Sequence, residues 1–150
     1  MLAIQPQDIE TIIRLGMATL LGGLIGLERE VHGKEAGFRT HALVCLGSAL
    51  IMVVSTQVYE VYHVHAEVDP SRIAAQVVSG IGFLGAGAII RDPRGIRGLT
   101  TAAGVWTAAG IGLACGFGQY RPALITTVFA LLILFVFSRV EKWFHRNTTS

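Results

Sequence analysis

Ionisable side chains near the ends of long apolar segments are the residues best placed for chemistry in this sequence. They include carboxylates, guanidinium groups and an imidazole: Glu28, Arg29, Arg39, His41, Arg91 and Arg97. Such charges can pair and hold neighbouring helix ends together, which is the simpler interpretation. They can also form the mouth of a site for an ion or another ligand, and the sequence leaves both interpretations open.

A second candidate set is polar but uncharged and lies inside the apolar segments: Gln76, Ser79, Thr101 and Thr107. Serine and threonine hydroxyls can bond to carbonyls of their own helix and therefore need no further role. The amide of Gln76 needs partners on another helix. We interpret the set as interhelical polar contacts, with the lining of an ion path as the alternative.

The pattern expected of a metal or catalytic site is missing. Magnesium prefers octahedral oxygen ligands, mainly carboxylates and water, and no Asp or Glu lies near the middle of an apolar segment. His63 and His65 lie close to Glu60, Glu67 and Asp69, a stretch more typical of a solvated loop than of a metal contact. We expect no metal site, no cofactor, no catalytic residue, no enzymatic activity and no nucleic-acid partner.

Glu10 and Arg14 are separated by four residues, so they lie on one face of a helix. We expect an ion pair within that helix, with the arginine reaching toward the nearer membrane surface.

Five apolar segments must position these residues: 9–27, 40–58, 73–90, 99–117 and 122–138. At roughly 1.5 Å per residue, each helix would reach about 25–29 Å and cross the hydrocarbon core. A mean hydropathy of +0.58, with 52% hydrophobic and 15% charged residues, agrees with a membrane protein. The predicted fold is all-α, a bundle of five transmembrane helices over residues 1–140 with a short basic cytoplasmic tail at 141–150.

The distribution of Lys and Arg predicts the orientation of this bundle. Nine of the 12 basic residues fall on one side: Arg29, Lys34, Arg39, Arg91, Arg94, Arg97, Arg139, Lys142 and Arg146. The opposite side has only Arg72 and Arg121. Because basic loops stay in the cytoplasm, we expect the N-terminus outside and the C-terminus inside.

Small residues recur at helical spacing and predict close helix crossings, because helices in lipid associate through tight packing. The positions are Gly23 and Gly26, then Gly82 and Ala86, then Gly104, Ala108, Gly112 and Gly116. The sequence leaves open whether the facing helix belongs to the same chain or to another copy. Cys45 and Cys115 are expected about 15 Å apart in depth, from a rise of roughly 1.5 Å per residue, which is too far for a disulfide.

Four strings in this order resemble the MgtC/SapB family: GGLIGLERE at 22–30, AGFRTH at 36–41, DPSRIAAQVVSGIGFLGAG at 69–87 and RGLTTAA at 97–103, followed by Trp106. The resemblance implies a multi-pass protein of the bacterial inner membrane that is connected with adaptation to low magnesium or ionic stress. It also implies modulation of other membrane machinery, such as a proton-driven ATP synthase. The resemblance also implies that many relatives carry an additional C-terminal domain, and nothing assigned to that domain is expected of these residues.

Two functions remain open from the sequence. The first is a module, embedded in membrane lipid and oligomeric, that modulates another membrane protein such as an ATP synthase or an ion transporter. The alternative is an oligomeric transporter or channel for magnesium or another small ion, with Gln76, Ser79, Thr101 and Thr107 lining a path between subunits. The residues favour the first function.

Overall fold

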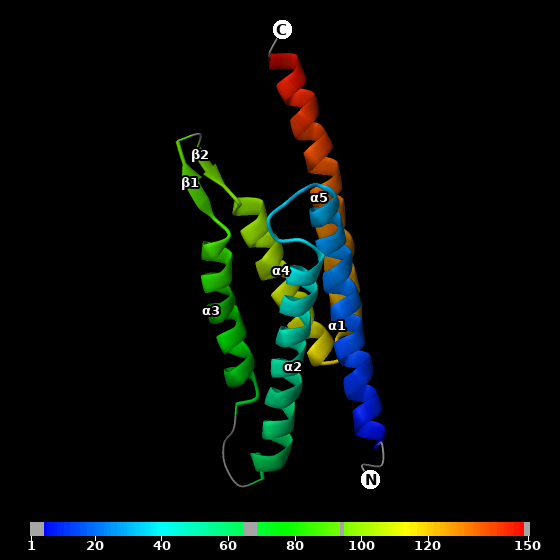
Figure 1. Cartoon of the computed structure of the whole chain (residues 1–150). Helices are drawn as coiled ribbons and strands as arrows, with labels where there is room; N and C mark the ends of the chain where they lie inside the picture. The colour runs from blue at the N-terminus through cyan, green and yellow to red at the C-terminus, as the bar shows by residue number, and fades with distance from the viewer. Residues whose placement is uncertain (1–4, 65–68, 94, 149–150) are drawn as a thin grey trace.

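The computed structural model describes residues 5–64, 69–93 and 95–148, and its elements are mostly long helices arranged side by side (Figure 1). They are α1 (Pro6–Val31), α2 (Phe38–Tyr62), α3 (Ser71–Gly87), β1 (Ile90–Asp92), β2 (Gly95–Arg97), α4 (Leu99–Gly116) and α5 (Tyr120–Thr148). The α1–α2 connection, the β-hairpin and the end of α5 lie at one end of the bundle, here called the hairpin end (Figure 1).

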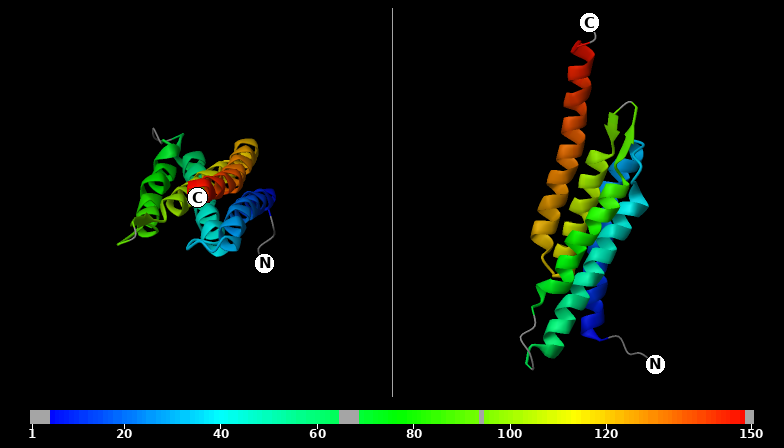
Figure 2. Two further views of the ribbon diagram at one scale, coloured as in Figure 1. Left: turned by 90° about the horizontal axis from the view of Figure 1, so that it is seen from above. Right: turned by 90° about the vertical axis from the view of Figure 1, so that its left-hand side faces the viewer.

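The predicted number of helices is confirmed, and four of them are long and apolar enough to cross a membrane: α1, α2, α4 and α5 up to Phe137. The chain is therefore a membrane protein. The fifth helix, α3, has 17 residues and lies at one side of the bundle, where it contacts mainly α2 and α4 (Figure 2). α5 continues to Thr148 and so includes most of the residues expected to form a separate tail.

Local hydrogen bonds explain where two of the helices begin. At the start of α1, the backbone N–H of Gln5 donates to the Asp8 carboxylate at 2.8 Å, and Pro6 occupies the first turn. Before α3, Asp69 Oδ1 accepts the backbone N–H of Ser71 at 2.8 Å and its hydroxyl at 2.7 Å. These bonds satisfy backbone donors that have no partner within the helix itself.

The β-hairpin corrects the sequence prediction that a helix runs over residues 73–90. α3 ends at Gly87, and Ile90 is paired with Arg97 in an antiparallel two-stranded sheet. The reversal depends on Gly95, whose φ of 128° suits glycine and few other residues. Strands of three residues are too short to leave a periodic pattern in the sequence, so the hairpin could not be foreseen.

The core lies where α1, α2 and α4 meet, and Cys45 and Cys115 belong to the same buried cluster within it. A Cβ added to Gly112 would lie 2.2 Å from the Cys45 carbonyl oxygen. Since Cys115 is three residues further along α4, its depth differs from that of Cys45 by about 5 Å. The expected separation of about 15 Å was wrong, because it assumed that α2 and α4 begin at the same depth. α4 begins nearer the hairpin end (Figure 1), so Gly112 in its last third lies beside Cys45 in the first third of α2.

Candidate functional site

Two buried basic side chains, Arg29 and His41, lie at the hairpin end, and a close crossing of α1 with the start of α2 positions them. A Cβ on Gly26 would lie 2.7 Å from the Gly37 carbonyl oxygen and equally close to the Phe38 Cα, so α1 and the turn before α2 are in backbone contact. Glu30 reinforces this crossing, because its Oε2 accepts the backbone N–H of Phe38 at 2.7 Å. The contact brings the last turn of α1 against the first turn of α2.

Arg29 lies in that last turn and is only 5% exposed. Its Nη1 is 3.4 Å from Glu28 Oε2, a long contact, and its Nε has no hydrogen-bond partner among the described residues. Glu28 is shared, since its Oε1 lies 3.1 Å from His32 Nδ1. The buried guanidinium is therefore only partly satisfied by the protein.

His41 is fully buried in the first turns of α2. Its Nδ1 donates to the Gly37 carbonyl oxygen at 3.0 Å, and its Nε2 has no partner among the described residues. The Nε2 atom faces Gly104 of α4, where an added Cβ would lie 3.1 Å away. The imidazole thus fills a space that the glycine leaves open and packs α2 against α4.

The six charged residues proposed from the sequence do not form a single cluster. Glu28, Arg29 and His41 lie within the bundle, whereas Arg39 and Arg91 are exposed. Arg97 is 65% exposed and pairs across the hairpin with Asp92 at 3.7 Å. The structure therefore separates an inner set from an outer set.

Arg29 of the inner set and Arg97 of the outer set both line a cavity of about 650 Å³, here called the hairpin-end cavity. Its polar lining is Arg29, Lys34, Glu35, Arg97, Thr100 and Thr101, and its apolar wall is Ile133, Leu134 and Phe137 of α5. Sequence reasoning missed Lys34 and Glu35 as site residues. They lie in a connection that showed no periodicity, and only its basic character was visible.

The four uncharged polar residues are also dispersed. Thr101 is 2% exposed at the hairpin-end cavity, whereas Gln76 lines a groove of about 1060 Å³ between α2 and α3. Ser79 is exposed on the outer face of α3. Thr107 lies on α4, where its hydroxyl donates to the Ala103 carbonyl oxygen of the same helix at 2.9 Å. One copy of the chain does not bring the four together along one path.

The groove between α2 and α3 has a largely apolar lining and a few polar groups: Ser48, Ser55, Asp69, Arg72 and Gln76. The Ser48 hydroxyl donates within its own helix, to Val44. The Ser55 hydroxyl instead donates to the carbonyl oxygen of Pro70, which fastens the start of α3 to α2. Asp69 and Arg72 lie at the end of this groove where α3 begins.

The small residues proposed for helix packing fall into two groups. The first group lies in tight contacts, and Ala108 in it is fully buried. A Cβ added to a glycine of this group would lie about 3.1 Å or less from the nearest atom of a neighbouring element, and these glycines are Gly23, Gly26, Gly104, Gly112 and Gly116. Gly82 and Ala86 are exposed, and nothing lies within 4 Å of a Cβ added to Gly82. The close crossing predicted at Gly82 and Ala86 is therefore absent within the described part of this chain, although α3 contacts α2 and α4 through its other face.

One close contact was missed by the sequence analysis. A Cβ on Gly22 would lie 2.5 Å from Cys45 Cβ and 2.7 Å from the His41 carbonyl oxygen, so this glycine permits the α1–α2 crossing. The signal was the Gly22–Gly23 pair itself, because two adjacent glycines can serve two neighbouring helix faces.

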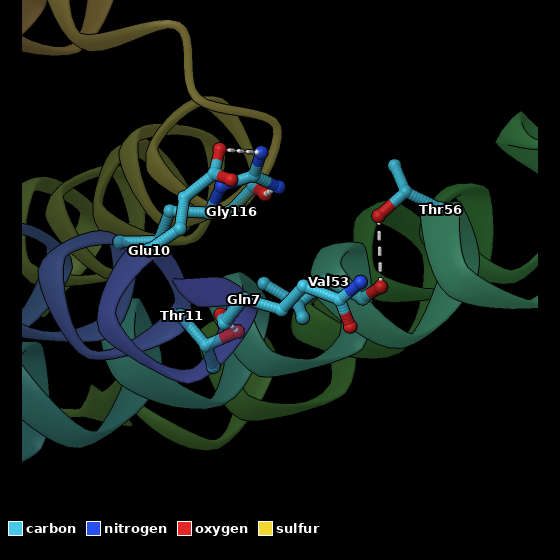
Figure 3. A network of polar contacts seen from close by, with 7 residues as sticks. Gln7, Glu10, Thr11, Val53, Thr56 and Gly116 are labelled. Atoms are coloured by element: carbon cyan, nitrogen blue, oxygen red, sulfur yellow. Dashed lines mark hydrogen bonds and ion pairs between the residues drawn. The ribbon is translucent and has the colours of Figure 1, made fainter. Parts of the chain in front are cut away.

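The opposite end of α4 is closed by Arg14 of α1. The expected ion pair between Arg14 and Glu10 is confirmed, and Arg14 Nη1 also donates to the Gly116 carbonyl oxygen at 2.8 Å (Figure 3). A cation at the end of a helix satisfies a free carbonyl and interacts favourably with the helix dipole. This arginine therefore has a structural explanation.

The histidine-rich stretch lies between α2 and α3, and His65 and Glu67 fall outside the described residues. His63 Nδ1 contacts the Tyr59 carbonyl oxygen at 2.9 Å. Over residues 5–64, 69–93 and 95–148, no group of three or more His, Cys, Asp or Glu is arranged to hold a metal ion.

Comparison with known proteins places the chain in context. Its sequence matches the MgtC family over residues 15–143. It is 49% identical over 133 residues to the Escherichia coli K12 protein named "Putative magnesium transporter YhiD". The aligned region covers 87% of this chain and 62% of that protein. It is 48% identical over 120 residues to "Protein MgtC" of Salmonella typhimurium LT2, covering 80% of this chain and 49% of that protein.

The chain thus spans about half to three-fifths of the length of these relatives. No solved structure matches it. The family match covers most of the chain and includes all the close crossings of α1, α2 and α4 described above. The chain belongs to the MgtC family.

Proposed function

We propose that this chain is a non-enzymatic, oligomeric protein of the bacterial inner membrane that supports adaptation to low magnesium or ionic stress by modulating another membrane protein. Membership of the MgtC family supports the connection with magnesium, as does the name of the Escherichia coli relative. In this proposal the hairpin end faces the cytoplasm and the N-terminus lies outside, which agrees with the excess of Lys and Arg at that end.

The observation that carries the proposal is the outer face of α3. Ala75, Ser79, Gly82 and Ala86 share this face and are all exposed. In lipid, such a face gains more from close contact with another helix than from contact with acyl chains. The partner would be a helix of another membrane protein, such as an ATP synthase or an ion transporter, or a second copy of this chain.

Complementation combined with crosslinking tests the proposal. A bacterium that lacks its own MgtC-type protein would express this chain with a photoreactive residue at Ala75 and grow in limiting magnesium. We expect growth to be restored and a membrane protein to be crosslinked. Gly82→Leu should abolish both effects while the protein still folds. Gly110→Leu, which also enters open space but on α4, is the matched control.

The second candidate is an oligomeric transporter of magnesium or another small ion. It is favoured by the groove between α2 and α3, where Gln76 lies among apolar residues and Asp69 and Arg72 stand at one end. Purified protein in liposomes would test it. Magnesium or proton flux above that of empty vesicles, lost in Gln76→Leu and kept in Ser79→Ala, would support transport through this groove, because Ser79 lies outside its lining, and would contradict the first proposal.

A further inference from the structure

Basic residues outnumber acidic residues in the lining of the hairpin-end cavity, and two of them also contact a carboxylate outside it, Arg29 with Glu28 and Arg97 with Asp92. Arg29, Lys34 and Arg97 line it, and Glu35 is the acidic residue in its lining. The three cations come from the end of α1, the α1–α2 connection and β2, so three separate parts of the chain converge there. A converging basic lining favours an anion as the ligand.

The first turn of α4 opens into the same cavity. Gly98, Leu99, Thr100 and Thr101 belong to the lining, and no side chain among the described residues caps this helix terminus. Gly98 has φ of 86°, and a Cβ there would lie 1.9 Å from the Ala88 carbonyl oxygen, so glycine is required for the approach. The first backbone N–H groups of a helix lack partners within the helix, and the positive end of its dipole attracts anions.

Arg29 provides an observation independent of the helix terminus. Arg29 lines the cavity and is only 5% exposed. Its Nε has no hydrogen-bond partner among the described residues. A buried donor without a partner costs free energy, and a guanidinium presents two adjacent N–H groups that suit the oxygens of a phosphate. Arg29 is therefore a lining residue whose hydrogen-bonding capacity the described residues do not fully use.

The apolar wall of the cavity lies on α5. Ile133 is 50% exposed and Phe137 is 62% exposed, so the wall continues onto the outer surface of the bundle. A ligand with a charged head and an apolar tail would lie with its head against Arg29 and its tail along α5.

We propose that the hairpin-end cavity binds an anionic phosphate group, held by Arg29, Lys34, Arg97 and the first N–H groups of α4. The phosphate comes either from the headgroup of an anionic phospholipid or from soluble inorganic phosphate. This inference does not depend on the proposed partner of α3, because the residues that line the cavity belong to other elements.

The full chain in phosphatidylcholine nanodiscs is the test system. In one arm, inorganic phosphate is titrated and binding is measured by calorimetry. In the other arm, phosphatidylglycerol is added and its retention is measured by native mass spectrometry. Saturable binding of phosphatidylglycerol alone identifies a lipid site, and saturable binding of inorganic phosphate identifies a soluble ligand.

Substitutions locate the binding. Lys34→Gln and Arg97→Gln change accessible side chains and should each weaken binding roughly fivefold. Arg29→Gln should weaken it roughly tenfold or more, provided that circular dichroism shows the helices intact. Arg39→Gln is the matched control, because it removes the same charge from an exposed position outside the lining. The proposal is overturned if neither probe binds saturably, or if Lys34→Gln and Arg97→Gln behave as Arg39→Gln does.

Discussion

α3 and α4 both contain small residues at helical spacing, yet only α4 uses them for backbone contact. A Cβ added to Gly112 or Gly116 would lie 2.2 or 2.3 Å from a carbonyl oxygen of α2. For Gly80 and Gly82 of α3, no atom of the described residues lies within 4 Å of the same added atom. The comparison shows that a row of small residues permits a close crossing but does not cause one.

The side chains that face each helix explain this difference. The glycines of α4 meet the backbone of α2, because Cβ atoms added to Gly112 and Gly116 would lie against the carbonyl oxygens of Cys45 and Ala49. α3 packs through a different face, Ala74, Val77, Ile81 and Gly85, and leaves the groove of about 1060 Å³ beside α2. Because dispersion falls steeply with distance, the α2–α4 contact gives more stability than the α2–α3 contact.

Gly112→Leu should have the largest effect, because it would break the close backbone contact between α4 and α2. The new side chain has no room beside the Cys45 carbonyl oxygen, so α2 and α4 must separate, at about 3 kcal/mol or more. Unfolding in mixed micelles with increasing denaturing detergent measures the loss. Gly110→Leu, two residues away in open space, should keep the parental stability. Equal stability of the Gly112 variant and the parent would disprove the packing argument.

Ser55→Ala should loosen α3 without disturbing α4. The Ser55 side chain is 1% exposed and its hydroxyl donates to the Pro70 carbonyl oxygen, so the substitution should cost about 1 kcal/mol. Faster hydrogen exchange confined to the first turns of α3 would report it. Ser48→Ala is the control, because that hydroxyl is equally buried but bonds only within α2. Identical exchange in both variants would show that the Ser55 bond does not hold α3.

Gly82→Ala should be neutral or slightly stabilising, in contrast to any change at Gly112. The added methyl group meets no atom within 4 Å, and alanine favours the helix over glycine by roughly 0.5–1 kcal/mol. The same detergent unfolding assay measures the gain. Clear destabilisation would mean that another copy of the chain covers this face in the micelle, which would show as a change in oligomer size.

The smallest effect concerns the start of α3 and its pH dependence. Hydrogen bonds from the Ser71 hydroxyl and backbone N–H hold the pKa of Asp69 below its ordinary value of 3.8. A lowered pKa means that the stabilisation is complete above pH 3.8 and is lost as the pH falls through the folded-state pKa. Titration of the Asp69 carboxyl carbon by NMR should give a midpoint below 3.8. In Ser71→Ala the midpoint should move back toward the ordinary value, and an unchanged midpoint would contradict this explanation.

Much of the fold was predictable because its causes are local. Apolar segments of membrane-crossing length predicted the number of helices, and spacings of four residues predicted the pair of Glu10 and Arg14. The hairpin was not predictable, because three-residue strands have no periodicity and the turn depends on a single glycine conformation. The residues of the candidate site were predicted only in part, since Arg29 was identified from the sequence whereas Lys34 and Glu35 were not.

The sequence by itself determined that this is a helical membrane protein of the MgtC family, because hydropathy, segment length and family motifs are read along the chain. Only the tertiary structure decided that Gly112 meets a backbone whereas Gly82 does not, and that Arg29 and the first turn of α4 share one cavity. The physical reason is that the contacts of a helix face depend on side chains from distant parts of the chain, and no local spacing specifies which helix will supply them.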